Sequence, residues 1–164
     1  MTVWLHHLLK RILIVDDSRL IREAIAKILL SCGLRKSAIA SIENGHDAID
    51  YLELHHADLI ICGDNLLDMS IQSLFRQINE KSDLDKMTVI IMQASDRLLG
   101  DLSFIKNRQH RVLQKPFNKS TLISTLLDLT KQPHFNVKKN VDTSEEFQVL
   151  SLIHISEPTR QAEI

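Results

Sequence analysis

Between residues 11 and 131, hydrophobic positions follow two periodicities that alternate along the chain. Short apolar segments predict strands at 11–15, 37–42, 58–62, 87–92 and 111–114, and three of them contain the runs "ILIV", "LIIC" and "VIIM", whose lack of polar alternation is typical of strands buried on both faces. Apolar residues three or four positions apart predict amphipathic helices at 18–32, 46–55, 70–80, 97–107 and 119–131. The chain therefore alternates five predicted strands with five predicted helices.

This alternation predicts one parallel sheet with helices on both faces, because parallel strands need crossover connections that cover the sheet. Right-handed crossovers leave few topologies for so short a chain. We therefore expect an α/β, flavodoxin-like, doubly wound sheet of five parallel strands. Asp17 or Ser18 can cap the start of the first helix, and Gly33 can close its end. Ligands of such sheets bind at the carboxyl ends of the strands.

Composition and charge exclude some classes of function. The chain of 164 residues fits one domain with tails, and its 20 basic residues balance 21 acidic ones, which disfavours a basic nucleic-acid-binding surface. No apolar run is long enough to span a membrane, and the N-terminus lacks a signal-peptide cleavage site, so we expect a cytoplasmic protein. Cys32 and Cys62 lack CxxC spacing and are expected to be buried thiols.

The residues that end or follow the predicted strands are the candidates for chemistry. They are Asp16 and Asp17 after the first strand, Gly63, Asp64 and Asn65 after the third, Ala94 and Ser95 after the fourth, and Lys115 after the fifth. Two adjacent carboxylates beside a lysine favour a divalent-cation and phosphoryl site, since Mg²⁺ prefers oxygen ligands and an ammonium group suits a phosphoryl oxygen. The plainer alternative is that Asp17 caps a helix and Lys115 is solvated in a loop.

Five segments in order, "ILIVDDSRLIR", "ENGHDAI", "DLIICGDNLLDMS", "VIIMQAS" and "VLQKPF", resemble the motifs of bacterial response-regulator receiver domains. The resemblance covers roughly residues 11–130. It implies that the acid pair Asp16 and Asp17 binds Mg²⁺ together with the backbone carbonyl of Asn65, and that Lys115 contacts a phosphoryl group. In the family, an aspartate ending the third strand accepts that group from a histidine kinase, and a Ser/Thr and an aromatic residue then switch position.

The chain departs from the family pattern at three of these positions. Alignment without a gap places Gly63 on the acceptor aspartate, Ala94 on the switch Ser/Thr and Val112 on the switch aromatic. We therefore expect no phosphoacceptor, no catalytic residue and at most weak Mg²⁺ binding. Asp64 is the surrogate candidate, although successive side chains of a strand point to opposite faces. Ser95 would supply the missing hydroxyl only after a shift of one residue.

These features lead to the hypothesis of a degenerate receiver domain in two-component phosphorelay signalling, acting as a non-enzymatic protein-interaction module. Its expected partner is a histidine kinase or another signalling protein, with no direct contact of this domain to nucleic acid or membrane. Two alternatives stay open. One is a phosphorylatable receiver that uses Asp64. The other, ranked lower, is a small phosphatase with Asp16 as nucleophile, because Asp-Asp-Ser stands where that class has Asp-x-Asp.

The chain divides into four predicted segments. They are an N-terminal extension at 1–10, the receiver domain at 11–131, a polar linker at 132–149 and a tail at 150–164. The stretch "LSLIHISEPTR" in the tail back-translates to a sequence that resembles a transposon-end adapter, so we interpret the tail as non-native and exclude it from the fold. This interpretation leaves room for a lost C-terminal output domain.

Overall fold

In the part of the chain that the structure describes, five parallel strands form one sheet in the order β2-β1-β3-β4-β5. The structure is a computed structural model that describes residues 9–81, 86–94, 102–105 and 109–130. The strands are β1 (Ile12–Val15), β2 (Ile39–Ile42), β3 (Leu59–Gly63), β4 (Thr88–Ala94) and β5 (His110–Lys115). The sequence order and the spatial order differ as a doubly wound sheet requires, which confirms the predicted fold class.

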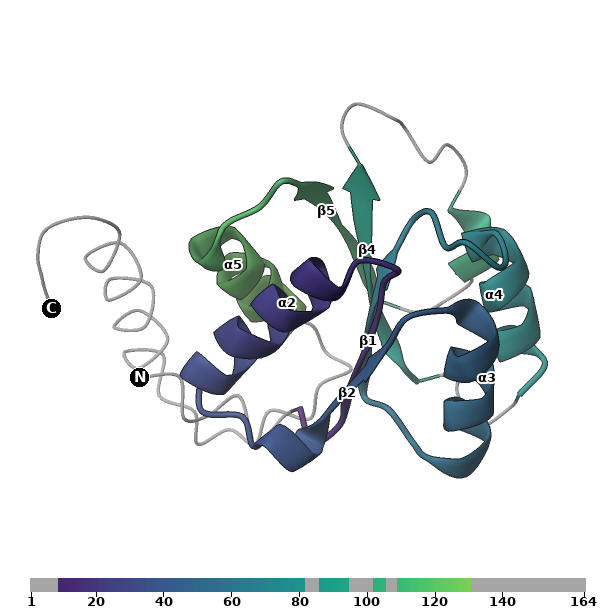
Figure 1. Cartoon of the computed structure of the whole chain (residues 1–164), viewed down its shortest axis with the longest axis horizontal. Helices are drawn as coiled ribbons and strands as arrows, with labels where there is room; N and C mark the ends of the chain where they lie inside the picture. The colour runs from purple at the N-terminus through teal and green to yellow at the C-terminus, as the bar shows by residue number, and fades with distance from the viewer. Residues whose placement is uncertain (1–8, 82–85, 95–101, 106–108, 131–164) are drawn as a thin grey trace, which may run out of the picture.

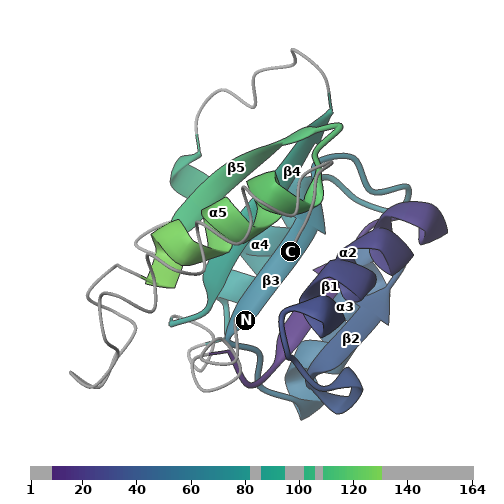
Figure 2. The same cartoon turned by 90° about the vertical axis from the view of Figure 1, so that its left-hand side faces the viewer.

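Helices cover both faces of this sheet. They are α2 (Arg19–Ser31), α3 (Gly45–Leu54), α4 (Ile71–Asn79) and α5 (Lys119–Thr130), together with the short 3-10 helices η1 (Lys36–Ala38) and η3 (Ser103–Ile105). Helices α2 and α5 lie on one side of the sheet, and α3 and α4 lie on the other (Figure 1). Figure 2 shows α2 and α5 facing the viewer in front of the strands.

The core consists of two layers because the central strands bury both of their faces. Every residue of β1 and β3 is buried. Along β1, Ile12 and Ile14 pack in the cluster that includes residues of α2 and α5, whereas Leu13 and Val15 pack in the cluster beneath α3 and α4. This alternation of side chains fixes which residues at the strand ends point to which side of the sheet.

Helix α2 has the predicted caps at both ends. The side chain of Ser18 accepts a hydrogen bond from the backbone of the first turn. At the other end, Gly33 has a φ of 93° and donates to the carbonyl of Leu30 at 3.0 Å, while Leu34 donates to Leu29 at 3.2 Å. This pair of bonds is a Schellman motif, which places the left-handed residue directly after the C-cap and favours glycine there.

The fold differs from the sequence-based expectation at several edges. Leu9, assigned to the N-terminal extension, is 2% exposed and packs in the core cluster of α2 and α5, so the packed domain begins before residue 11. Of the predicted helix at 97–107, the described residues form only the 3-10 turn η3, and the rest lies outside the described residues. The predicted linker and tail, 132–164, also lie outside them. In the described residues, no helix is long and apolar enough to cross a membrane.

Candidate functional site

The register of the sheet brings the candidate residues to one edge. Val15 of β1 pairs with Cys62 of β3, and Ala94 of β4 pairs with Lys115 of β5. Because all the strands are parallel, the residues that follow them emerge at the same edge. The expectation that Asp16, Gly63, Asp64, Ala94 and Lys115 end strands of one sheet at one edge therefore agrees with the structure.

Asp16 is the most buried of the acids at this edge, with 1% of its surface exposed. One carboxylate oxygen, Oδ1, accepts a hydrogen bond from the backbone N–H of Ser18 at 2.8 Å. The other, Oδ2, accepts from the Nζ of Lys115 at 2.9 Å. Its backbone carbonyl accepts from the Nη1 of Arg22 at 2.6 Å. Both carboxylate oxygens of Asp16 are therefore engaged by groups of the protein itself.

The ion pair between Lys115 and Asp16 crosses the sheet. Lys115 ends the edge strand β5, whereas Asp16 follows β1, and β3 and β4 lie between these two strands in the sheet. The side chain of Lys115 is 21% exposed, and that of Asp16 is 1% exposed. The long aliphatic stem of the lysine thus lies over the strand ends and delivers its charge to a buried carboxylate.

Gly63, the last residue of β3, leaves the space into which this carboxylate fits. A Cβ atom built on Gly63 would lie 2.5 Å from Oδ2 of Asp16 and 3.2 Å from its Cγ. Carbon and oxygen atoms that are not bonded to each other do not approach so closely. Any side chain at position 63 would therefore force the Asp16 carboxylate to move, and the oxygen that it would displace is the one bound to Lys115.

Asp64, the surrogate candidate, is bound elsewhere. Its Oδ2 accepts from the backbone N–H of Ala94 at 3.3 Å, and its own N–H donates to the carbonyl of Met92 at 3.0 Å. Its Oδ1 is buried without a hydrogen-bond partner. The Asp64 carboxylate therefore joins the ends of β3 and β4, as the alternation of side chains along a strand would suggest, and its bonded partner is backbone rather than Lys115.

Of the other predicted positions, Asp17 and Asn65 lie in the loops after β1 and β3 at this edge, whereas Val112 lies within the edge strand β5. Asp17 is exposed, and its pKa is raised by partial burial and by a hydrogen bond and charge repulsion from the neighbouring Asp16 carboxylate. Asn65 is exposed and forms an isolated antiparallel bridge with Ser70. Val112 on β5 is 41% exposed. Ser95 lies outside the described residues.

The donor groups at this edge do not form a ready magnesium site. Mg²⁺ binds oxygen ligands in a near-ideal octahedron and commonly uses one or two carboxylates. The carboxylate of Asp16 is committed to Lys115 and Ser18, and Asp17 is the acid that remains on this loop. Among the residues that the structure describes, no group of three or more His, Cys, Asp or Glu side chains could hold a metal ion.

A neighbouring contact was not anticipated from the sequence. Asp68, in the loop after β3, accepts from the backbone N–H groups of Gly45 and His46, each at 2.9 Å, and contacts Nδ1 of His46 at 2.6 Å. Burial alone would raise the pKa of Asp68, but these hydrogen bonds lower it to about 2. The contact holds the loop against the start of α3. No local pattern in the sequence indicates it, because Asp68 and His46 are 22 residues apart.

A shallow pocket lies beside this contact. Its walls are mostly acidic or polar, and the lining residues are Asp17, Glu43, Asn44, His46, Asp47, Leu67 and Asp68. Two of the acids already have partners within the pocket, because Asp68 accepts from the start of α3 and Asp47 accepts from the side-chain amide of Asn44. The pocket therefore lies where the loops that follow β1, β2 and β3 meet.

The comparisons with known proteins support the same fold. The model of the response regulator receiver domain family matches residues 12–127. The chemotaxis response regulator CheY4 of Vibrio cholerae is 22% identical, with a TM-score of 0.63 over 73% of this chain and 97% of that one. The signal receiver domain of a protein described as a Luxo repressor, from Vibrio parahaemolyticus, is 27% identical, with a TM-score of 0.61 over 74% and 92% of the two chains.

A third similar structure was solved with a metal. The receiver domain of a sensor histidine kinase from Pseudomonas aeruginosa has a magnesium ion coordinated in its active site cleft. It is 22% identical to this chain, with a TM-score of 0.63 over 75% of this chain and 98% of that one. No curated protein matches the sequence. Since the family match covers well over half of the chain, this protein belongs to the response regulator receiver domain family of two-component signalling.

Proposed function

We propose that this receiver domain is degenerate and acts as a protein-interaction module in two-component signalling, without phosphorylation of an aspartate. The observation that carries the proposal is Gly63 at the end of β3, with the Asp16 carboxylate lying in the space that a side chain at this position would need. Glycine has no oxygen that could attack a phosphorus atom. A receiver with this residue at its acceptor position has no group there to modify.

Two further positions support the same proposal. Ala94, aligned with the switch Ser/Thr, carries no hydroxyl group that could follow a phosphoryl oxygen, and Val112, aligned with the switch aromatic, carries no ring. Mg²⁺ binding is at most weak, through Asp17 and the backbone carbonyl of Asn65. Here the domain has no catalytic residue and works by presenting a surface to its partner.

The partner is a histidine kinase or another signalling protein in a bacterial cytoplasm. Support comes from the family and from a relative that is itself the receiver domain of a sensor histidine kinase. The balanced charge of the chain, with 20 basic and 21 acidic residues, supports a protein partner over nucleic acid.

One observation favours a second candidate, a phosphorylatable receiver that uses Asp64. The Oδ1 atom of this residue is buried and lacks a hydrogen-bond partner, which is an unusual state for a carboxylate oxygen. Against this candidate, the other oxygen of Asp64 binds the N–H of Ala94, and the lysine at this edge binds Asp16.

Incubation with acetyl phosphate and Mg²⁺, followed by intact-mass measurement, tests the proposal. The wild type is expected to gain no phosphoryl mass. The matched variant Gly63→Asp, which restores a carboxylate at the end of β3, is expected to gain one phosphoryl group. If the wild type does gain mass, Asp64→Asn and Asp16→Asn identify the acceptor. Loss of the gain in the first variant would establish Asp64, and loss in the second alone would revive the alternative of Asp16 as nucleophile.

A further inference from the structure

We infer that Lys115 is the resident counter-ion of Asp16, and that their ion pair over Gly63 locks the strand-end site in one geometry in place of a cation and a phosphoryl group. The inference deepens the proposed function by naming how the same site is regulated. It rests on that proposal only in taking the site as unmodified.

The first argument is steric, and it links the ion pair to the glycine. The oxygen of Asp16 that binds Lys115 is the same oxygen that lies 2.5 Å from the place of a Cβ on Gly63. A side chain on residue 63 therefore cannot be added while this ion pair keeps its present geometry. The absence of a side chain at Gly63 and the ion pair between Asp16 and Lys115 therefore depend on each other.

The second argument is electrostatic. A carboxylate that is 1% exposed is costly to bury unless it is paired and hydrogen-bonded. Asp16 meets this requirement with the ammonium group of Lys115 on one oxygen and the N–H of Ser18 on the other. A divalent cation that approached this carboxylate would have to displace the ammonium group or be repelled by it. The ion pair thus competes directly with metal binding.

The third argument concerns what the ion pair connects. Lys115 is the last residue of β5 and is followed closely by α5, which begins at Lys119. Asp16 lies two residues before Ser18, the N-cap of α2. Since α2 and α5 cover the same side of the sheet, the ion pair joins the connections that lead into both helices (Figures 1 and 2). A partner that contacts this side meets the same surface whether or not Mg²⁺ or a phosphodonor is present.

Removal of the lysine charge tests this inference. Lys115→Met keeps much of the side-chain volume but leaves the Asp16 carboxylate without its counter-ion. Thermal unfolding and calorimetric titration with MgCl2 are measured at constant ionic strength. We expect MgCl2 to leave the melting temperature of the wild type nearly unchanged. Lys115→Met should melt at a lower temperature than the wild type. It should bind Mg²⁺ about tenfold more tightly, because the competing ammonium group is gone. MgCl2 should then restore part of the lost melting temperature, because the cation binds only the folded state.

Matched variants separate the ion pair from a general loss of charge. Lys119→Met removes an exposed lysine four positions away and should leave the Mg²⁺ response at the level of the wild type. The double variant Asp16→Asn with Lys115→Met removes both charges. It should fold, and it should not show the higher Mg²⁺ affinity of Lys115→Met. The double variant also serves if Lys115→Met fails to fold, since a folded double variant then supports the pairing and an unfolded one contradicts it.

Equal Mg²⁺ affinities for the wild type and Lys115→Met would overturn the inference, and so would equal melting temperatures for Lys115→Met and Lys119→Met. Neither measurement depends on phosphate transfer. A wild type that gains phosphoryl mass but shows the expected Mg²⁺ response would refute the proposed function and leave the ion pair established as the counter-ion. The opposite combination would refute the ion-pair lock alone.

Discussion

Gly63 at the end of β3 and Gly45 at the start of α3 are both crowded by a neighbouring side chain. A Cβ atom on Gly63 would lie 2.5 Å from Oδ2 of Asp16, and one on Gly45 would lie 2.6 Å from both Cγ and Sδ of Met69. The loops that supply these neighbours follow β1 and β3, and each is held by an aspartate. The two glycines are therefore crowded to a similar degree, but a substitution would have to move a carboxylate at Gly63 and a methionine side chain at Gly45.

The difference lies in how firmly the neighbour is held. The Asp16 carboxylate is fixed by Lys115 and by the N–H of Ser18, so it cannot turn without breaking two hydrogen bonds. Met69 has an unbranched, flexible side chain that adapts to changes in the space around it. Crowding of a glycine thus predicts intolerance to substitution only where the neighbouring group is itself bound. Four predictions test this comparison.

The largest effect is expected for Gly63→Ala. The added methyl group must displace the Asp16 carboxylate, so the free energy of unfolding should fall by about 2 kcal/mol, which combines overpacking with weakened hydrogen bonds. Urea unfolding measures the loss. In an Asp16→Ala background the same substitution should cost clearly less, because the obstructing carboxylate is absent. Equal losses in the two backgrounds would show that Asp16 is not the obstacle.

Asp68→Ala should have the next largest effect. It removes the acceptor for the N–H groups of Gly45 and His46, as in the loss of a helix N-cap, and the free energy of unfolding should fall by about 1 kcal/mol. The wild type should also lose stability as the pH falls. The pKa of Asp68 is about 2 against an ordinary 3.8, so its contribution is complete above the ordinary value and disappears as the pH falls through the lower one.

Urea unfolding over this pH range tests the assignment to Asp68. The free energy of unfolding of the wild type should decrease more between about pH 4 and about pH 2 than that of Asp68→Asn, because the variant has no carboxyl group to protonate there. The other acids are common to both proteins and cancel in the difference. Parallel pH profiles would show that folding does not lower the pKa of Asp68.

Gly45→Ala should have a smaller effect than Gly63→Ala. Met69 can move aside, and alanine is the better helix former at the start of α3, so the net loss should be about 0.5 kcal/mol. The N–H that binds Asp68 is kept in the variant. A loss as large as that of Gly63→Ala would contradict the view that mobility of the neighbour decides the outcome.

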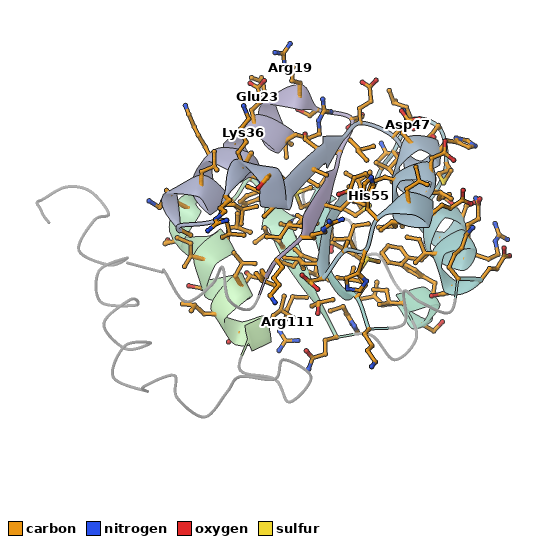
Figure 3. The ribbon with its side chains drawn as sticks, turned by 90° about the horizontal axis from the view of Figure 1, so that it is seen from below. Arg19, Glu23, Lys36, Asp47, His55 and Arg111 are labelled. Atoms are coloured by element: carbon orange, nitrogen blue, oxygen red, sulfur yellow. The ribbon has the colours of Figure 1, made fainter. Side chains whose placement is uncertain are left out.

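The smallest effect is expected at an exposed ion pair. Arg19 and Glu23 lie one turn apart on α2, with a distance of 2.8 Å between Nε and Oε2, and their side chains are 82% and 58% exposed (Figure 3). Exposed pairs of this kind contribute little because water and salt screen them. Glu23→Gln should leave the midpoint of urea unfolding unchanged within error. A clearly lower midpoint would show that an exposed ion pair of this domain contributes to its stability as a buried one does.

Much of the fold could be predicted from local pattern. The central strands were found because burial on both faces leaves continuous apolar runs, and the ends of α2 were found because Ser18 and Gly33 have specific capping roles. The direction of Asp64 also followed from the alternation of side chains along a strand. Each of these inferences depends on residues that are close together in the sequence.

The contacts between distant segments could not be predicted in this way. Asp16 and Lys115 were expected at one edge of the sheet, but which atoms meet there depends on the register of the strands and on the space above Gly63. The contact of Asp68 with His46 requires the loop after β3 to reach α3, which no local pattern encodes. The helix predicted at 97–107 depends on weak apolar spacing, and of this range the structure describes only residues 102–105.

The ion pair between Asp16 and Lys115 also bears on the order in which the domain forms. It joins residues 99 positions apart, at the first and the last strand of the domain in chain order. Contacts of such long range form late in folding, because closing so large a loop costs entropy before other contacts offset it. During synthesis, the Asp16 carboxylate therefore has no counter-ion until nearly the whole domain has left the ribosome. Any shortened chain that ends before β5 would keep a bare carboxylate at the end of β1.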